Sequence, residues 1–147
     1  MFSSIVVGTD GSETAGKAVL QATELARQVG ASVSLVSAYE PVSGNRLREE
    51  RREVPKDLEW MVNPREDVEA TLKEAAEQVE GAGVKVGTFA REGDAADAIL
   101  DVAEETHADL IVVGNKGMTG TKRFLLGSVP NKVSHHAPSS VLIIRTT

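Results

Sequence analysis

The residues with the clearest chemical potential are the glycines and serine of one stretch, Gly114 to Val129, which reads GNKGMTGTKRFLLGSV. Residues Ala108 to Val113 before it form an apolar run rich in β-branched side chains, which is typical of a buried strand. Residues Pro130 to His136 after it read as a short helix. A glycine-bearing loop that ends at a helix N-terminus offers backbone N–H groups and partial positive charge, so the ligand it suits is a phosphate.

Two widespread phosphate-binding motifs are absent from the sequence. No G-x-x-x-x-G-K-[ST] occurs, which excludes a Walker A loop, and no G-x-G-x-x-G follows the first predicted strand, which excludes the dinucleotide fingerprint. The stretch instead contains Gly114-x2-Gly117-x9-Gly127-Ser128. Gly114 and Gly117 would let the backbone approach one phosphate, while Gly127 and Ser128 would hold another. The plainer alternatives are ordinary turn glycines and a helix N-cap at Ser128.

This spacing resembles the nucleotide-binding motif of the universal stress protein family. Two further segments stand in that family's order, the opening Ile5 to Ser12 (IVVGTDGS) and the closing Ser140 to Ile144 (SVLII). The resemblance therefore extends over nearly the whole chain. It implies a stress-linked regulatory protein that binds ATP, with Mg²⁺ carried by the nucleotide. It also implies no enzymatic role beyond slow ATP hydrolysis or autophosphorylation.

The resemblance also implies which positions contact the nucleotide. Asp10, at the end of the first strand, matches an aspartate beside the nucleotide, although a local turn bond to the following N–H groups is an alternative role. Thr9 stands where the family often has proline, and Ala38 matches a position whose backbone meets adenine. Lys116 would either reach a phosphate or face water. The expected nucleotide contacts are Thr9, Asp10, Ala38, Val113, Gly114, Asn115, Lys116, Gly117, Gly127, Ser128 and Val129.

Cyclic AMP is the alternative ligand to ATP. Residues 127–130 (GSVP), with the terminal Thr146 and Thr147, resemble the family members that bind cyclic AMP. A true ATPase or kinase is disfavoured because no general base stands beside a nucleophile. The three histidines show no convergence with other ligand residues, which argues against a metal site.

Composition limits the class of protein. The 147 residues predict one domain, 1–147, with a formal net charge of −6 and only 3% aromatic residues, which argues against nucleic-acid binding. There are no cysteines, which excludes disulfides and thiolate chemistry. The N-terminus resembles no signal peptide, and no apolar run approaches the length that spans a membrane. We therefore expect a cytoplasmic protein with no membrane partner.

Apolar periodicity predicts alternating strands and helices, which is typical of a parallel α/β sheet with helices on both faces. Ligands in such sheets bind where the strand order reverses, at the carboxyl ends of the strands. The glycine-rich loops follow the first and fourth strands, so these two should be neighbours. This predicts an open, Rossmann-like five-stranded sheet of order 3-2-1-4-5, which the resemblance also implies. The expected strands are Ser4–Gly8, Val33–Tyr39, Val84–Ala90, Leu110–Val113 and Val141–Ile144.

Two segments carry further expectations. Residues Pro41 to Pro64 are dense in charge and lack periodicity, so they form either a solvated excursion or a flap that contacts the ligand through Trp60 and Met61. The last strand, Val141–Ile144, is unbroken apolar sequence at a predicted sheet edge. Because such edges are normally covered or paired, we expect a homodimer through this strand.

Overall fold

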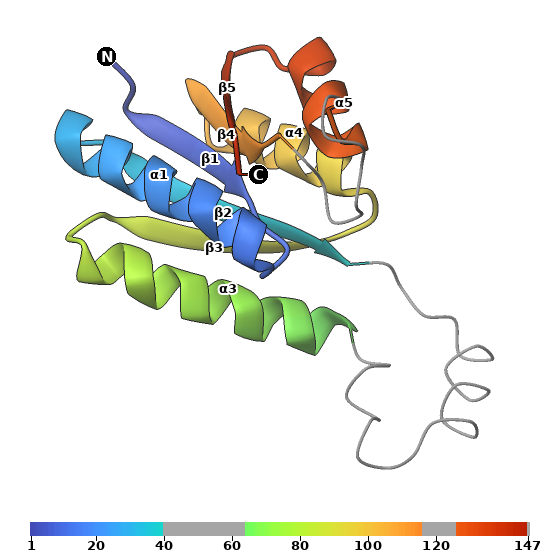
Figure 1. Cartoon of the computed structure of the whole chain (residues 1–147), viewed down its shortest axis with the longest axis horizontal. Coiled ribbons are helices and arrows are strands. Elements are labelled where there is room, and N and C mark those ends of the chain that lie inside the picture. Colours follow the sequence, from blue (N-terminus) through green and yellow to red (C-terminus); the bar gives the residue numbers. More distant parts are fainter. Residues whose placement is uncertain (40–63, 116–125, 147) are drawn as a thin grey trace.

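The computed structural model describes residues 1–39, 64–115 and 126–146 (Figure 1). No helix within these ranges has the length and apolar character needed to cross a membrane. The predicted flap at residues 41–63 lies outside the described residues, and Pro64 begins a helix. The elements are β1 (Ser4–Gly8), α1 (Glu13–Val29), β2 (Ser32–Tyr39), α3 (Pro64–Gly81), β3 (Val86–Glu92), α4 (Ala95–Glu105), β4 (Leu110–Gly114), α5 (Ser128–His136) and β5 (Ser140–Ile144).

The five strands form one parallel sheet in the order β3-β2-β1-β4-β5, which confirms the predicted fold class. Ile5 of β1 stands at the centre, in register with Val33 of β2 on one side and Leu110 of β4 on the other. The strand order therefore reverses between β1 and β4. This junction is where a ligand is expected in a sheet of this kind.

Helices cover both faces of the sheet. In Figure 1, α1 and α3 lie on one face, and α4 and α5 lie on the other. Since successive strand side chains point to opposite faces, Val7 packs in the α1/α3 core, where Leu72 of α3 is buried, and Val6 packs in the α4/α5 core beside Val102 of α4. Two buried cores thus hold the sheet, and the carboxyl ends of its strands are positioned by packing on either side.

The helix termini follow local sequence signals. Ser12 caps α1 by accepting the N–H of Ala15 at 3.1 Å, and α1 ends at Gly30 with a positive φ of 74°. At α5, however, the N-cap is Gly127, which has no side chain to offer, and Ser128 is the first helical residue. The prediction that Ser128 could act as an N-cap is therefore wrong.

The third strand begins and ends two residues later than predicted. Val84, the predicted start, belongs to the turn after α3, where its N–H donates to the Val79 carbonyl at 3.4 Å. The pairing with β2 continues to Tyr39 and Glu92, so charged residues are included at the carboxyl end. Backbone pairing with a longer neighbour outweighs the polar character that ended the predicted strand. The predicted edge position of this strand is confirmed.

Candidate functional site

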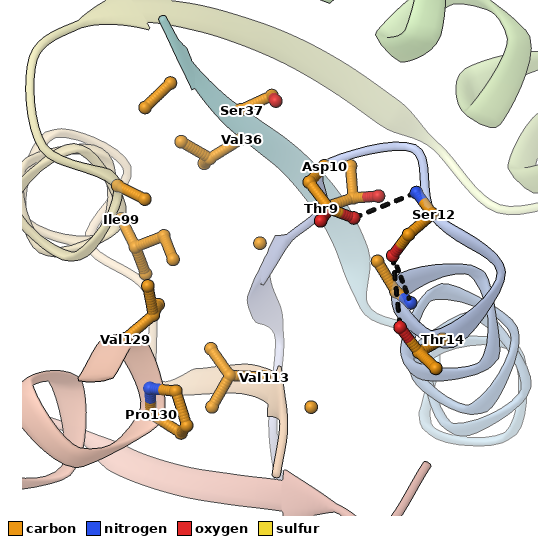
Figure 2. A pocket seen from close by; sticks show the side chains of 15 residues that line it. Thr9, Asp10, Ser12, Thr14, Val36, Ser37, Ile99, Val113, Val129 and Pro130 are labelled. Atoms are coloured by element: carbon orange, nitrogen blue, oxygen red, sulfur yellow. Dashed lines mark hydrogen bonds between the residues drawn. The ribbon is translucent and has the colours of Figure 1, made fainter. Parts of the chain in front are cut away.

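A cleft opens at the carboxyl ends of β1, β2 and β4, between α1 on one side and α4 and α5 on the other (Figure 2). The space between its walls, open solvent included, amounts to about 550 Å³. The described residues that line it are Gly8, Thr9, Asp10, Ser12, Thr14, Ala15, Val36, Ser37, Ala38, Ala95, Ile99, Val113, Gly114, Val129 and Pro130.

The polar wall of the cleft is the turn between β1 and α1. Thr9 is buried, and its N–H donates to the Val36 carbonyl at 2.9 Å, so pairing with β2 continues past β1. The Thr9 hydroxyl accepts the Gly11 N–H at 3.2 Å, and Asp10 Oδ1 accepts the Ser12 N–H at 2.9 Å. The alternative role of Asp10, a local turn bond, is therefore present. Among the described lining residues, the Asp10 carboxylate is the one charged group.

The opposite wall is apolar. Ile99 from α4, with Val129 and Pro130 from α5, faces the Thr9–Asp10 turn across the cleft (Figure 2). Ala95 from α4 also lines the cleft. A Cβ atom on Gly8 would lie 2.5 Å from Ile99 Cδ1, closer than real carbon atoms approach. The absence of a side chain at position 8 therefore lets Ile99 lie against the end of β1. The result is a cleft with one hydrogen-bonding wall and one wall suited to a flat, weakly polar group.

The start of α5 offers backbone donors at one end of the cleft. The first N–H groups of a helix have no acceptor within the helix, and Gly127 supplies no side-chain cap for those of Ser128 and Val129. By contrast, α1 and α4 are capped by the side chains of Ser12 and Asp94. Within the part of the chain that the structure describes, no side chain caps the first N–H groups of α5, and an anion would suit these donors best.

An ion-paired cluster joins the two helices of the apolar wall. Lys132 Nζ of α5 lies 3.3 Å from Asp94 Oδ2 and 2.9 Å from Asp97 Oδ1 of α4. The hydrogen bond from the Asp97 N–H is the main cause that lowers the pKa of the Asp94 carboxyl below its ordinary value, and Lys132 lowers it further. The Lys132 charge is thus balanced by two carboxylates within the protein.

The predicted site residues divide into three groups. Thr9, Asp10, Ala38, Val113, Gly114 and Val129 line the cleft. Asn115, Gly127 and Ser128 adjoin it, because Asn115 follows Gly114 and the other two begin α5. Lys116 and Gly117 lie outside the described residues.

Sequence reasoning missed the contribution of α4, namely Ala95 and Ile99. The apolar pattern of this segment predicts a helix core and indicates no ligand contact. One signal could have indicated these residues. Both lie in the first turns of a helix that starts at the carboxyl edge of the sheet, where ligands bind.

The described residues hold no group of three or more His, Cys, Asp or Glu side chains arranged for a metal ion. The fold and the cleft together define a Rossmann-like α/β protein with a cleft at the switch point of its sheet, the position where sheets of this kind bind ligands. A model of the universal stress protein family matches residues 1–145, and the chain belongs to this family.

The relatives agree with this assignment. Universal stress protein Rv1636 of Mycobacterium tuberculosis is 38% identical over 151 residues, which cover 99% of this chain and 98% of that protein. A universal stress protein solved in complex with cAMP has a TM-score of 0.73 and 31% identity, with 99% of this chain and 98% of the other covered. The universal stress protein from Archaeoglobus fulgidus in complex with dAMP has a TM-score of 0.66 and 27% identity, with coverage of 97% and 98%.

Proposed function

We propose that the protein is a stress-linked regulatory protein that binds an adenine nucleotide, with ATP carrying Mg²⁺ as the ligand. The observation that carries this proposal is the asymmetry of the cleft. The wall formed by Ile99, Val129 and Pro130 is apolar, and the Asp10 turn opposite is polar. Among the described residues, no side chain caps the N-terminus of α5. Base, ribose and phosphate each need one of these three environments.

The base and sugar fit the end of the cleft near β2. Ala38 is half-buried at the end of that strand, where main-chain groups can pair with adenine without any particular side chain. Asp10 uses one carboxylate oxygen on the Ser12 N–H, and a carboxylate has further lone pairs for ribose or base donors. The relatives solved with cAMP and with dAMP support an adenine nucleotide as the ligand.

The phosphates would lie at the start of α5. At this helix end, the described groups that could donate hydrogen bonds to a phosphate are the N–H groups of Ser128 and Val129 and the Ser128 hydroxyl. Asp10 adds a negative charge to the same cleft, which disfavours a bare triphosphate. Mg²⁺ prefers oxygen ligands and is commonly bound by phosphates together with a carboxylate. We therefore propose that it enters bound to the nucleotide and lies near the Asp10 carboxylate.

Cyclic AMP is the second candidate. The described cleft lining contains one acidic and no basic side chain, which favours a ligand with a single negative charge over one with several. The 31% identical protein solved in complex with cAMP supports the same choice. The two candidates differ in how strongly binding should depend on the phosphate-facing residues.

Titration calorimetry with ATP, AMP and cyclic AMP, with and without Mg²⁺, tests the proposal. Ser128→Ala removes a hydroxyl that is not an N-cap, so its melting temperature should stay near that of the wild type. One hydrogen bond to a charged group corresponds to about a tenfold to hundredfold loss of affinity, expected for ATP more than for AMP or cyclic AMP. Gly117→Val should act in the same direction. Ser134→Ala, near the other end of α5, is the matched control.

Several outcomes would decide against ATP. Cyclic AMP binding without ATP binding in the wild type would make the second candidate the ligand. An equal loss for all three ligands in Ser128→Ala would place the dominant contacts on adenosine, near Asp10 and Ala38. A wild type that binds none of the three would reject nucleotide binding altogether.

We also propose that the protein acts as a cytoplasmic homodimer joined through β5. In the described chain β5 is an outer strand of the sheet, paired with β4 alone. Leu142 is 39% exposed there, whereas Ile143 packs against the α4/α5 core. An exposed leucine on an unpaired edge supports pairing with a second copy.

A further inference from the structure

Asn115 joins three segments that meet beside the cleft. Its N–H donates to the Ile144 carbonyl at 2.8 Å, and its own carbonyl accepts the Gly127 N–H at 3.0 Å. Its side-chain Oδ1 accepts both the N–H and the hydroxyl of Thr146, at 2.8 and 3.1 Å. One residue thus connects the end of β4, the N-cap of α5 and the segment after β5.

The chemistry of Thr146 fixes how the Asn115 amide is oriented. A backbone N–H only donates, so the Asn115 atom that meets it must be the carbonyl oxygen. Thr146 is only 4% exposed, so its hydroxyl requires a partner inside the protein, and Asn115 Oδ1 supplies it. The side-chain oxygen of Asn115 is therefore engaged within the protein.

The same network reaches α1. Lys17 Nζ donates to the Thr146 carbonyl at 3.2 Å. Lys17 lies less than one helical turn after Thr14 and Ala15, which line the cleft. The network therefore joins three walls of the cleft. These are β4, α5 and α1, which line the cleft with Gly114, Val129 and Ala15 respectively.

We propose that Asn115 and Thr146 are positioning residues that set the spacing of these three walls and thereby the affinity for the adenine nucleotide. The inference rests on the proposed function, and it gives the two residues a role that requires no contact with the ligand. It also links the cleft to the outer strand of the sheet, because Thr146 follows the last residue of β5 by two positions. A change at the β5 edge should then alter nucleotide affinity.

The test compares two substitutions of the same residue. Thr146→Val keeps the shape of the side chain and removes the hydroxyl, whereas Thr146→Ser keeps the hydroxyl and removes the methyl group. Affinities for AMP, cyclic AMP and ATP with Mg²⁺ are measured by calorimetry, about 15 °C below each variant's melting temperature. Thr106→Val is the control, because its hydroxyl donates to the Val102 carbonyl at the far end of α4 and lines no part of the cleft.

Loss of one neutral hydrogen bond predicts a decrease of about twofold to tenfold in affinity for Thr146→Val, similar for all three ligands. The uniformity is expected because the walls move for every ligand. Thr146→Ser should stay within about twofold of the wild type, and Thr106→Val should lower the melting temperature without changing affinity. Unchanged affinity in Thr146→Val overturns the proposal, and so does an equal loss in Thr146→Val and Thr146→Ser.

Asn115→Ala provides a second measurement. It removes both side-chain bonds, so the expected loss is about fivefold to a hundredfold, and adding Thr146→Val to it should cost less than about a further twofold. Independent losses that multiply would overturn the coupling.

The exchange rate of the Gly127 amide proton reports on the network without any ligand. It should rise in Asn115→Ala and Thr146→Val, and an unchanged rate would overturn the inference. If the wild type binds none of the nucleotides, the proposed function fails, and this exchange measurement still decides whether the network holds the start of α5.

Discussion

Gly11 lies in the turn that forms the polar wall of the cleft, and two physical effects oppose a side chain there. Its φ is +82°, in the left-handed region that disfavours residues with a Cβ atom. A Cβ atom would also lie 2.7 Å from Thr71 Cγ2 and 3.2 Å from Thr71 Oγ1 of α3. Gly30 isolates the first effect, because its φ is +74° and nothing lies within 4 Å of the position that a Cβ atom would take there. The two glycines thus form a matched pair.

The magnitudes follow from this geometry. The left-handed conformation costs a non-glycine residue roughly 1–2 kcal/mol, and alanine recovers about 0.4–1 kcal/mol by restricting the unfolded chain. Gly30→Ala should therefore lower the free energy of unfolding by about 1 kcal/mol. Crowding of the kind found at Gly11 costs about 1–3 kcal/mol more, so Gly11→Ala should lose roughly 2–4 kcal/mol.

Urea denaturation measures the cost of the left-handed conformation and the cost of crowding separately. It is applied to the single variants Gly11→Ala, Gly30→Ala and Thr71→Ala and to the double variant Gly11→Ala/Thr71→Ala. Replacement of Thr71 by alanine removes the two close atoms and leaves Thr71 Cβ at 3.5 Å, an ordinary contact. The double variant should therefore recover most of the crowding cost, which would appear as a favourable coupling of about 1–3 kcal/mol. Equal losses in Gly11→Ala and Gly30→Ala, or the absence of coupling with Thr71, would refute the reasoning.

Three further predictions concern stability and assembly. The N–H of Ser3 holds the pKa of the Asp109 carboxyl below its ordinary value of 3.8, so its stabilising effect is present above pH 3.8 and is lost as pH falls through the lower folded pKa. Asp109→Asn should accordingly be less stable than the wild type in urea at pH 7, with a smaller difference at pH 3. Gly8→Ala should displace Ile99 and destabilise the protein by about 1–3 kcal/mol, and adding Ile99→Val should restore part of this, as judged by thermal melting. Leu142→Lys should convert the proposed dimer to a monomer in light scattering, and a wild type that is monomeric at micromolar concentration would contradict the dimer.

The sheet order was predictable from sequence because two independent features agree on it. The glycine-rich turns after the first and fourth strands mark the reversal point, and alternation of strands with helices implies parallel pairing. Local caps were equally readable, since Ser12 and Asp94 each precede an apolar periodic run and accept an N–H three residues later. These features depend on neighbouring residues in the sequence, so the sequence displays them directly.

Features that depend on tertiary contacts were not predictable in this way. The later end of β3 at Glu92 is set by the length of β2, and Ser128 loses the N-cap role because α5 begins one residue earlier in the chain than the serine would require. The contribution of Ile99 depends on the missing side chain at Gly8, which is more than 90 residues away along the chain. Likewise, the bond between Asn115 and Thr146 joins residues separated by 31 positions.

The two sides of the cleft are stabilised in different ways, and this difference determines which substitutions should change affinity. In the Thr9–Ser12 turn, two side-chain bonds go to N–H groups within two residues and add to the bond from Thr9 to Val36, so this wall is stabilised largely by local bonds. The wall formed by Gly114 and the start of α5 is held instead through Asn115 by a segment beyond β5. Disruption of the first wall should cost mainly folding stability, since the local bonds form with the fold itself. Disruption of the second leaves both cores intact, so its cost should appear mainly as lost nucleotide affinity.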